Sequence, residues 1–97
     1  MRADYDSKAN AVSISLSSRT RAERADHVHP RAIVAVHDGD PVELQLLYPD
    51  LGIDEPLGAV SSAYGSVDKE ALVAAVQAAL AAPDRSVTLE VAVRSAA

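Results

Sequence analysis

The stretch YDSKANAVSISL, residues 5–16, decides the fold, because a turn signal runs directly into a strand pattern. Asp6 can accept a backbone N–H two or three residues further on, and Asn10 tolerates left-handed backbone, so residues 6–10 predict a hairpin loop. After the loop, apolar residues alternate with serines, which is the period of a strand with one buried face. The apolar residues on that face are Val12, Ile14 and Leu16. We therefore predict a β-hairpin in which residues 2–5 pair with residues 11–17.

A second hairpin is predicted in the middle of the chain. Residues 32–36 form a continuous apolar run of strand length that is rich in β-branched residues, as in a central strand. The run stops at Asp38-Gly39, a strong turn pair, and residues 42–47 then alternate between apolar and polar. The polar segment 18–26 before this hairpin predicts an exposed edge strand or loop. Its charged side chains would prevent the sheet edge from pairing with a strand of another chain.

The remaining chain predicts one helix and a last strand. Residues 49–65 are punctuated by proline and glycine and predict an irregular loop. Ser66 is a good N-cap and Pro83 ends the apolar pattern, which predicts a helix between them. Residues 86–94 alternate again and predict a final strand.

Together these elements predict a single α+β domain over residues 1–97. Its parts are a β-meander (1–48), the irregular loop (49–65) and a helix with the terminal strand (66–97). We expect an antiparallel meander of about five strands with the C-terminal α-helix packed on one face of the sheet. The final strand joins either the edge of this sheet or a second subunit.

The N-terminal half resembles a known group. Tyr5-Asp6, Asn10-Ala11, Ile14 and Leu16 look like the N-terminal signature of the bacterial domain-of-unknown-function family numbered 2283. The resemblance covers roughly residues 1 to 50 and implies a short β-rich fold. The chain departs from the family in the small Ser13 and in the segment added after Tyr48. The family has no established activity, so the resemblance implies no catalytic residue.

Composition excludes several classes of function. The 97-residue chain has a formal net charge of −5 and no cysteine, so disulfides and thiol chemistry are excluded. The acidic balance argues against nucleic acid as the main partner, because binding phosphates requires a positive surface. No apolar run approaches the roughly 20 residues of a membrane span, and no apolar leader begins the chain. We therefore expect a cytoplasmic protein with no membrane partner.

Three histidines are candidate metal ligands. His27 and His29 share one face of an extended segment, and His37 comes just before the next turn. If the strands brought the three imidazoles together, they would suit zinc. No fourth ligand stands at a telling spacing, so solvated or hydrogen-bonded histidines are expected instead, and no metal or cofactor is predicted.

No motif identifies a catalytic residue. The serines lack a nucleophile elbow and the four glycines are dispersed, so neither a serine hydrolase nor a phosphate loop is predicted. Catalytic residues stay unknown, and enzymatic activity is not expected. The titratable side chains available for acid–base chemistry are Asp4, Asp6, Asp26, His29 and His37.

Two functions are compatible with these observations. The leading one is a small non-enzymatic protein that acts by self-association or by binding a protein partner. The alanine-rich helix and a core without Phe or Trp favour a homodimer. The family resemblance implies one concrete form, an antitoxin-like accessory protein. The alternative is a small-ligand-binding or catalytic domain in which residues 48–65 form a lid. Its binding residues would be Tyr48, Tyr64, His29 and His37, with His27 nearby.

Overall fold

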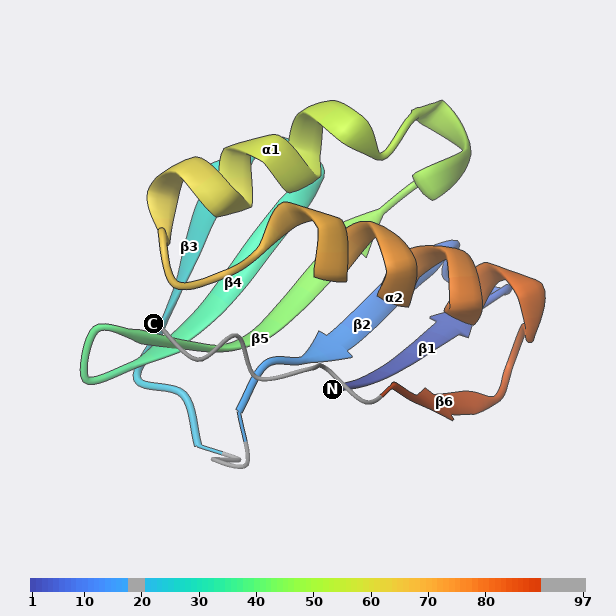
Figure 1. The fold of residues 1–97 in the computed structure, drawn as a ribbon, viewed down its shortest axis with the longest axis horizontal. Coiled ribbons are helices and arrows are strands. Elements are labelled where there is room, and N and C mark those ends of the chain that lie inside the picture. The colour runs from blue at the N-terminus through green and yellow to red at the C-terminus, as the bar shows by residue number, and fades with distance from the viewer. Residues whose placement is uncertain (18–20, 90–97) are drawn as a thin grey trace.

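The computed structural model describes residues 1–17 and 21–89. Over these residues, six strands form one antiparallel sheet, and two α-helices lie side by side on one face of it (Figure 1). The elements in chain order are β1 (Arg2–Asp6), β2 (Ala11–Ser15), β3 (Arg24–His29), β4 (Ala32–His37), β5 (Asp40–Leu47), the short 3₁₀ turn η1 (Pro49–Leu51), α1 (Asp54–Ala63), α2 (Lys69–Ala81) and β6 (Ser86–Thr88). The predicted α+β class is confirmed.

Both predicted hairpins are present. In the first, β1 pairs antiparallel with β2, and the Asp6 carboxylate accepts the backbone N–H groups of Lys8 and Ala9 at 2.9 and 3.2 Å. Asn10 ends this turn with a left-handed backbone at φ 51°. In the second, β4 pairs with β5 across the Asp38-Gly39 turn, where both residues have positive φ. Side-chain chemistry in each turn therefore sets the register of the strands that follow.

The strand order differs from the predicted meander. The order is β3-β4-β5-β2-β1-β6, so β2 pairs with β5 instead of with β3, the next strand in sequence. In this pairing Val12 lies opposite Leu46 and Ile14 opposite Leu44, and all four side chains are fully buried. Pairing with β5 places two apolar strands at the centre, whereas the polar β3 takes the edge that its charges suit.

The segment 49–65, expected to be an irregular loop, contains η1 and all of α1. Pro56 occupies the first turn of α1, where its missing N–H is not required, so it does not interrupt the helix. Four apolar residues at helical spacing point to the core. Leu57 and Val60 are fully buried, and Ile53 and Tyr64 pack against the core from the two ends of the helix.

The second helix begins later than predicted, at Lys69 instead of Ser66. Its N-cap is Asp68, whose side chain accepts the backbone N–H of Glu70, while Ser66 lies outside the helix. An ionised carboxylate at this position also complements the positive end of the helix dipole. The helix ends at Ala81, before Pro83 as predicted.

The final strand joins the edge of the sheet by pairing with β1. Ala3 lies opposite Val87 in this pairing. Strand β6 covers residues 86–88, and the rest of the predicted strand, residues 90–94, lies outside the described residues.

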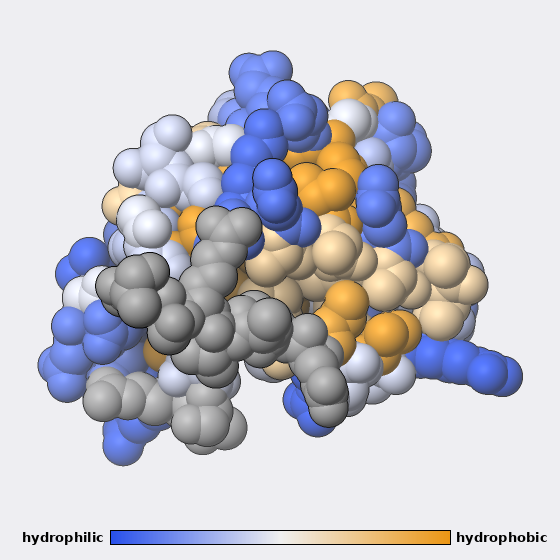
Figure 2. Space-filling view, viewed as in Figure 1, coloured by the Kyte–Doolittle hydropathy of each residue, from blue (hydrophilic) through white to orange (hydrophobic). Residues whose placement is uncertain are grey.

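One apolar core lies between the sheet and the two helices. Its largest fully buried side chains come from the three strands β2, β4 and β5 and from both helices. Two alanines of α2 are completely buried, which lets the helix approach the sheet closely, and other alanines form the weakly apolar surface that Figure 2 shows over α2. Among the described residues, no helix has the length and apolar character needed to cross a membrane.

Candidate functional site

The segment between β5 and α1 stands out because it exposes large apolar side chains. It consists of Tyr48, η1 and Gly52, and we refer to it as the Tyr48–Gly52 turn. Tyr48 is 51% exposed and Leu51 is 67% exposed, and in the described part of the chain they are the exposed large hydrophobic residues. Folding does not require these side chains, because they contribute little to the core.

The backbone of the turn is well defined. Tyr48 adopts a left-handed conformation with φ 49° and ψ 61°, and Gly52 has φ 112°. The N–H groups of Leu51 and Gly52 donate to the carbonyls of Tyr48 and Pro49 at 3.0 and 3.1 Å. Because a bulky residue is unfavourable in the left-handed region, by about 1–3 kcal/mol, surrounding contacts must hold Tyr48 there.

Arg31 supplies two of those contacts. Its guanidinium Nη1 donates to the carbonyl of Tyr48 at 2.9 Å and to the carbonyl of Gly52 at 2.8 Å, which joins the two ends of the turn. Arg31 is itself fixed by the adjoining sheet, since its carbonyl accepts the N–H of Leu47 at 2.8 Å. Charge-assisted hydrogen bonds of this kind are stronger than neutral ones.

Asn10 supplies the other contacts, from the far end of the first hairpin loop. Its carbonyl accepts the N–H of Tyr48 at 2.8 Å, and its side-chain amide donates to the Asp50 carboxylate at 2.7 Å. The hydroxyl of Tyr5 donates to the Asn10 side-chain oxygen at 2.9 Å. The hairpin loop therefore also positions the exposed turn, a second role that its turn signal did not reveal.

The turn lies in an acidic stretch of sequence. Residues 40–68 contain no Lys or Arg, and the three acidic residues nearest the turn are Asp50, Asp54 and Glu55. Lys69 from α2 contacts Asp54 at 2.7 Å, but the Asp54 side chain stays 90% exposed, so solvent weakens this ion pair. This end of the molecule therefore combines exposed apolar side chains with three carboxylates, whose charge Arg31 and Lys69 offset only in part.

The structure brings together two of the four predicted binding residues. Tyr48 is part of the turn, and His29 lies beside it, because the His29 Nδ1 accepts the backbone N–H of Arg31 at 3.1 Å. On its other side, the His29 Nε2 lies 3.7 Å from Glu55 at the start of α1. His29 therefore contacts the backbone at Arg31 and the start of α1, both next to the turn.

Tyr64 lies at the other end of α1 and contacts different residues. Its hydroxyl donates a hydrogen bond to the Asp26 carboxylate, and Arg24 contacts the same carboxylate at 3.2 Å. The Tyr64 hydroxyl, followed by Arg24, lowers the pKa of Asp26 below its usual 3.8. Partial burial, followed by the hydrogen bond to Asp26, raises the pKa of Tyr64 above its usual 10.0. This network fastens α1 to the edge strand β3.

The three histidines do not converge. His27 lies opposite Ile33 and His29 opposite Ala32, whereas His37 is at the other end of β4, opposite Asp40. Ile33, the partner of His27, and His37 are four residues apart on β4, which corresponds to about 13 Å along the strand. His37 instead has carboxylate neighbours, Glu23 Oε1 at 3.6 Å and Asp38 Oδ2 at 3.5 Å.

The other titratable candidates have structural explanations. Asp6 caps the first turn, and Asp4 lies on β1 opposite Ser13, where it is exposed. Asp26 is occupied by Tyr64 and Arg24. These contacts assign no catalytic pair to the candidate residues.

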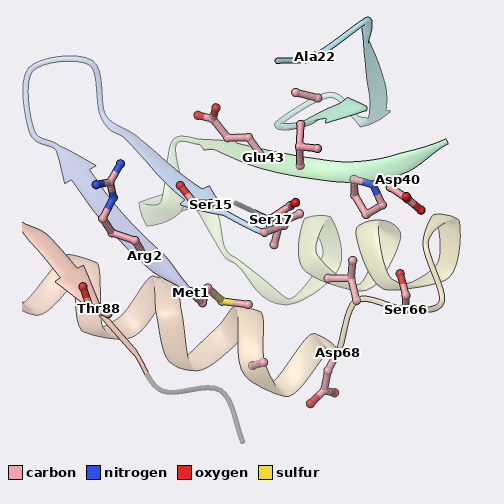
Figure 3. Close-up of a pocket in the computed structure, with 16 residues that line it drawn as sticks. Met1, Arg2, Ser15, Ser17, Ala22, Asp40, Glu43, Ser66, Asp68 and Thr88 are labelled. Atoms are coloured by element: carbon pink, nitrogen blue, oxygen red, sulfur yellow. The ribbon is translucent and has the colours of Figure 1, made fainter. Parts of the chain in front are cut away.

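A cavity of about 1100 Å³ opens near the start of α2 (Figure 3). Its described lining includes Met1, Leu16 and Val67 with Ser66 and Asp68, and none of the four predicted binding residues. Ser17 and Thr88 also line it. The cavity therefore gives no support to residues 48–65 as a lid over a site.

Comparisons with protein-family models, with curated proteins and with solved structures found no match to this chain. The function is therefore inferred from the residues of the chain itself.

Sequence reasoning missed three residues of the site, namely Asn10 as a support, Arg31 and Leu51. An arginine directly after Pro30 has no distinguishing spacing, and its partners are backbone carbonyls that any sequence supplies. Leu51 had a usable signal, because it is a large apolar residue between Asp50 and Gly52, outside any alternating or helical pattern.

Proposed function

We propose that this chain is a small non-enzymatic protein that acts by binding another protein through the Tyr48–Gly52 turn. The observation that carries the proposal is the exposure of Tyr48 and Leu51 on a turn held by Arg31 and Asn10. Aromatic side chains are enriched among the residues that dominate binding energies at protein interfaces. A tyrosine and a leucine in water therefore suit a contact that buries them.

The fixed conformation of the turn supports the same function. Binding by a flexible loop must overcome the entropy lost when the loop becomes ordered. Here the carbonyls at both ends of the turn are bonded to Arg31, and the N–H of Tyr48 is bonded to Asn10. Little ordering remains to be done on binding, so more of the interaction energy appears as affinity.

The charge around the turn favours a basic partner over a second copy of this chain. Asp50, Asp54 and Glu55 would face the same carboxylates across a symmetric contact, and like charges oppose such an interface. A partner with an apolar depression bordered by Lys or Arg would complement the turn. Self-association is the second form of the proposal, through the alanine surface of α2.

An antitoxin-like accessory role in the cytoplasm is one concrete form of this function. It rests on the resemblance of the N-terminal half to the family numbered 2283. A small basic toxin encoded beside this chain would fit the charge argument. If the product of a neighbouring gene bound this chain equally well after the turn was altered, the Tyr48–Gly52 turn would not be the binding surface.

Photo-crosslinking from the turn tests the proposal. A photoreactive amino acid replaces Leu51 in the producing cell, and a matched variant carries it at the exposed Gln77 of α2. We expect one basic protein to crosslink from position 51 and not from position 77. With that protein purified, Tyr48→Ala and Leu51→Ala should each weaken binding by about tenfold, whereas Gln77→Ala should leave the dissociation constant unchanged.

Two results would contradict the proposal. One is equal crosslinking from both positions, and the other is an unchanged dissociation constant in the two turn variants. Sedimentation of the unmodified chain and of Leu51→Ala at tens of micromolar tests the second form, self-association. A dimer that survives Leu51→Ala would place self-association on a surface other than the turn.

A further inference from the structure

We propose a binding site for a divalent transition-metal ion, formed by Glu23, His37 and Asp38. Among the described residues these three are the group whose ligand atoms all lie within 4.8 Å of one another. The site lies at the end of β4, five residues or about 17 Å along that strand from Ala32, which lies opposite His29 and so near the Tyr48–Gly52 turn. It is therefore independent of the proposed protein contact.

The distances suit a metal better than they suit direct hydrogen bonds. Glu23 Oε1 lies 3.6 Å from His37 Nδ1, and Asp38 Oδ2 lies 3.5 Å from His37 Nε2. Both separations are too long for a good hydrogen bond, and because they involve the two opposite ring nitrogens, only the first can be a ligand–ligand distance around a single ion. Two ligands of a tetrahedral zinc ion with bonds of about 2.1 Å are about 3.4 Å apart. The separation of Nδ1 and Oε1 therefore fits an ion between them, and Asp38, whose ligand atom lies within 4.8 Å of the others, would turn toward that ion to complete the site.

The buried nitrogen of His37 is a second observation that points to a ligand. The Nδ1 atom has no solvent contact and no hydrogen-bond partner among the described residues, although the side chain as a whole is 26% exposed. A buried polar atom without a partner is unfavourable, because it has lost its hydrogen bonds to water. Coordination of a cation by Nδ1 would remove that cost.

The backbone holds the three ligands in place. The N–H of Glu23 donates to the carbonyl of Val36 at 2.8 Å, which continues the pairing of β3 with β4. The N–H of Asp38 donates to Glu23 Oε2 at 3.3 Å, and this contact leaves Oε1 directed at His37. His37 ends β4, Asp38 begins the tight turn to β5, and Glu23 directly precedes β3, so all three lie at the same end of the sheet.

The ligand types select the class of ion. Calcium and magnesium prefer oxygen ligands only, whereas imidazole with carboxylates suits zinc and its neighbours such as cobalt and nickel. Three protein ligands leave coordination positions for water, and two exposed carboxylates attract cations to the site. We therefore infer a reversible site of moderate affinity in preference to a structural zinc that the fold requires.

Titration of the tag-free chain with Zn²⁺, and separately with Co²⁺, tests the site. We expect one ion per chain by calorimetry, and a visible Co²⁺ absorption typical of low coordination number. His37→Gln should weaken binding by about tenfold or more, and Glu23→Gln should weaken it by a comparable factor. His27→Gln is the matched control and should change nothing, because His27 lies on a different strand, opposite Ile33.

A second readout does not depend on affinity. In nitrogen NMR spectra of the imidazoles, Zn²⁺ should shift the Nδ1 resonance of His37 while the resonances of His27 and His29 stay in place. The proposal is overturned if no heat is detected at millimolar Zn²⁺, if His27→Gln weakens binding as much as His37→Gln, or if the His37 resonances respond to pH alone, which would mean that the cluster binds only a proton.

Discussion

Strand β5 and the turn that follows it use the same kinds of residue in opposite ways. Leu44 and Leu46 of β5 are fully buried at the centre of the sheet, whereas Tyr48 and Leu51, a few residues later, are half or more exposed. The strand is stabilised by removing apolar surface from water. The turn is held instead by polar contacts from Arg31 and Asn10.

This difference separates residues that the fold needs from residues that it does not. Leu44 and Leu46 of β5 belong to the buried core cluster, so burial explains their presence. Burial explains neither Tyr48 nor Leu51, and the left-handed backbone at Tyr48 adds a cost. The turn is where this chain departs from what stability alone would select.

The largest effect is expected from a charge at the centre of the sheet. Ile14→Asp should unfold the domain, because an unpaired buried charge costs several kcal/mol and a domain of this kind has a total stability of about 5–15 kcal/mol. Circular dichroism during heating measures the effect. Ser15→Asp, on the opposite face of the same strand and beside Arg2, should melt close to the parent. Equal melting of Ile14→Asp and the parent would mean that β2 is not central.

Truncating two leucines on either side of the η1–α1 boundary sharpens the comparison. Leu57→Ala should lower the free energy of unfolding by about 2–5 kcal/mol, because Leu57 is fully buried between α1 and the sheet. Leu51→Ala should change it by less than about 0.5 kcal/mol, because Leu51 is exposed. Denaturant unfolding measures both. Similar losses in the two variants would show that the turn contributes to the fold and would weaken its assignment as a binding surface.

Removing the Arg31 contacts should loosen the turn more than the sheet. Arg31→Met loses two hydrogen bonds to carbonyls, and we expect a loss of about 1–2 kcal/mol, concentrated locally. Hydrogen exchange should accelerate at the Leu51 and Gly52 amides and stay slow in β5. Arg21→Met, at an exposed position, is the control. Uniform acceleration across the sheet would contradict a local role for Arg31.

The smallest effect is a change in acid stability at the other end of α1. The hydroxyl of Tyr64, followed by Arg24, lowers the pKa of Asp26 in the folded state. The stabilisation is therefore complete above the usual value of 3.8 and disappears as the pH falls through the lower folded value. Unfolding midpoints measured from neutral pH downwards should fall less steeply in Asp26→Asn than in the parent. Parallel curves would mean that this network does not fasten α1 in solution.

The local elements of this fold were predictable because their signals are local. Two pairs of residues indicate turns through their own side chains and backbone preferences, namely Asp6 with Asn10 and Asp38 with Gly39. Both hairpins formed as predicted. Helix α1 was missed because Pro56 and Gly58 look like loop residues. Spacing held the better signal, since Ile53, Leu57, Val60 and Tyr64 repeat every three or four residues.

The strand order and the arrangement of the site could not be predicted from the sequence and became visible only in the structure. The alternation in β2 fits pairing with β3 or with β5 equally well, and only the shared core distinguishes them. For the site, Tyr48 and His29 were named, but their relation depends on Arg31, whose bonds are to backbone carbonyls. The cluster around His37 was missed for a similar reason, because Glu23 reaches it through the pairing of β3 with β4 and not through sequence spacing.

The place of β1 between β2 and β6 has a consequence for how the chain folds during synthesis. Arg2 lies opposite Ser15 on one side and Thr88 on the other, so one edge of β1 can pair early and the other only after β6 has emerged from the ribosome. Such distant pairings slow folding. Until β6 is made, the β1 edge of the β1–β2 hairpin stays open, and a chaperone or a neighbouring nascent chain can pair with it.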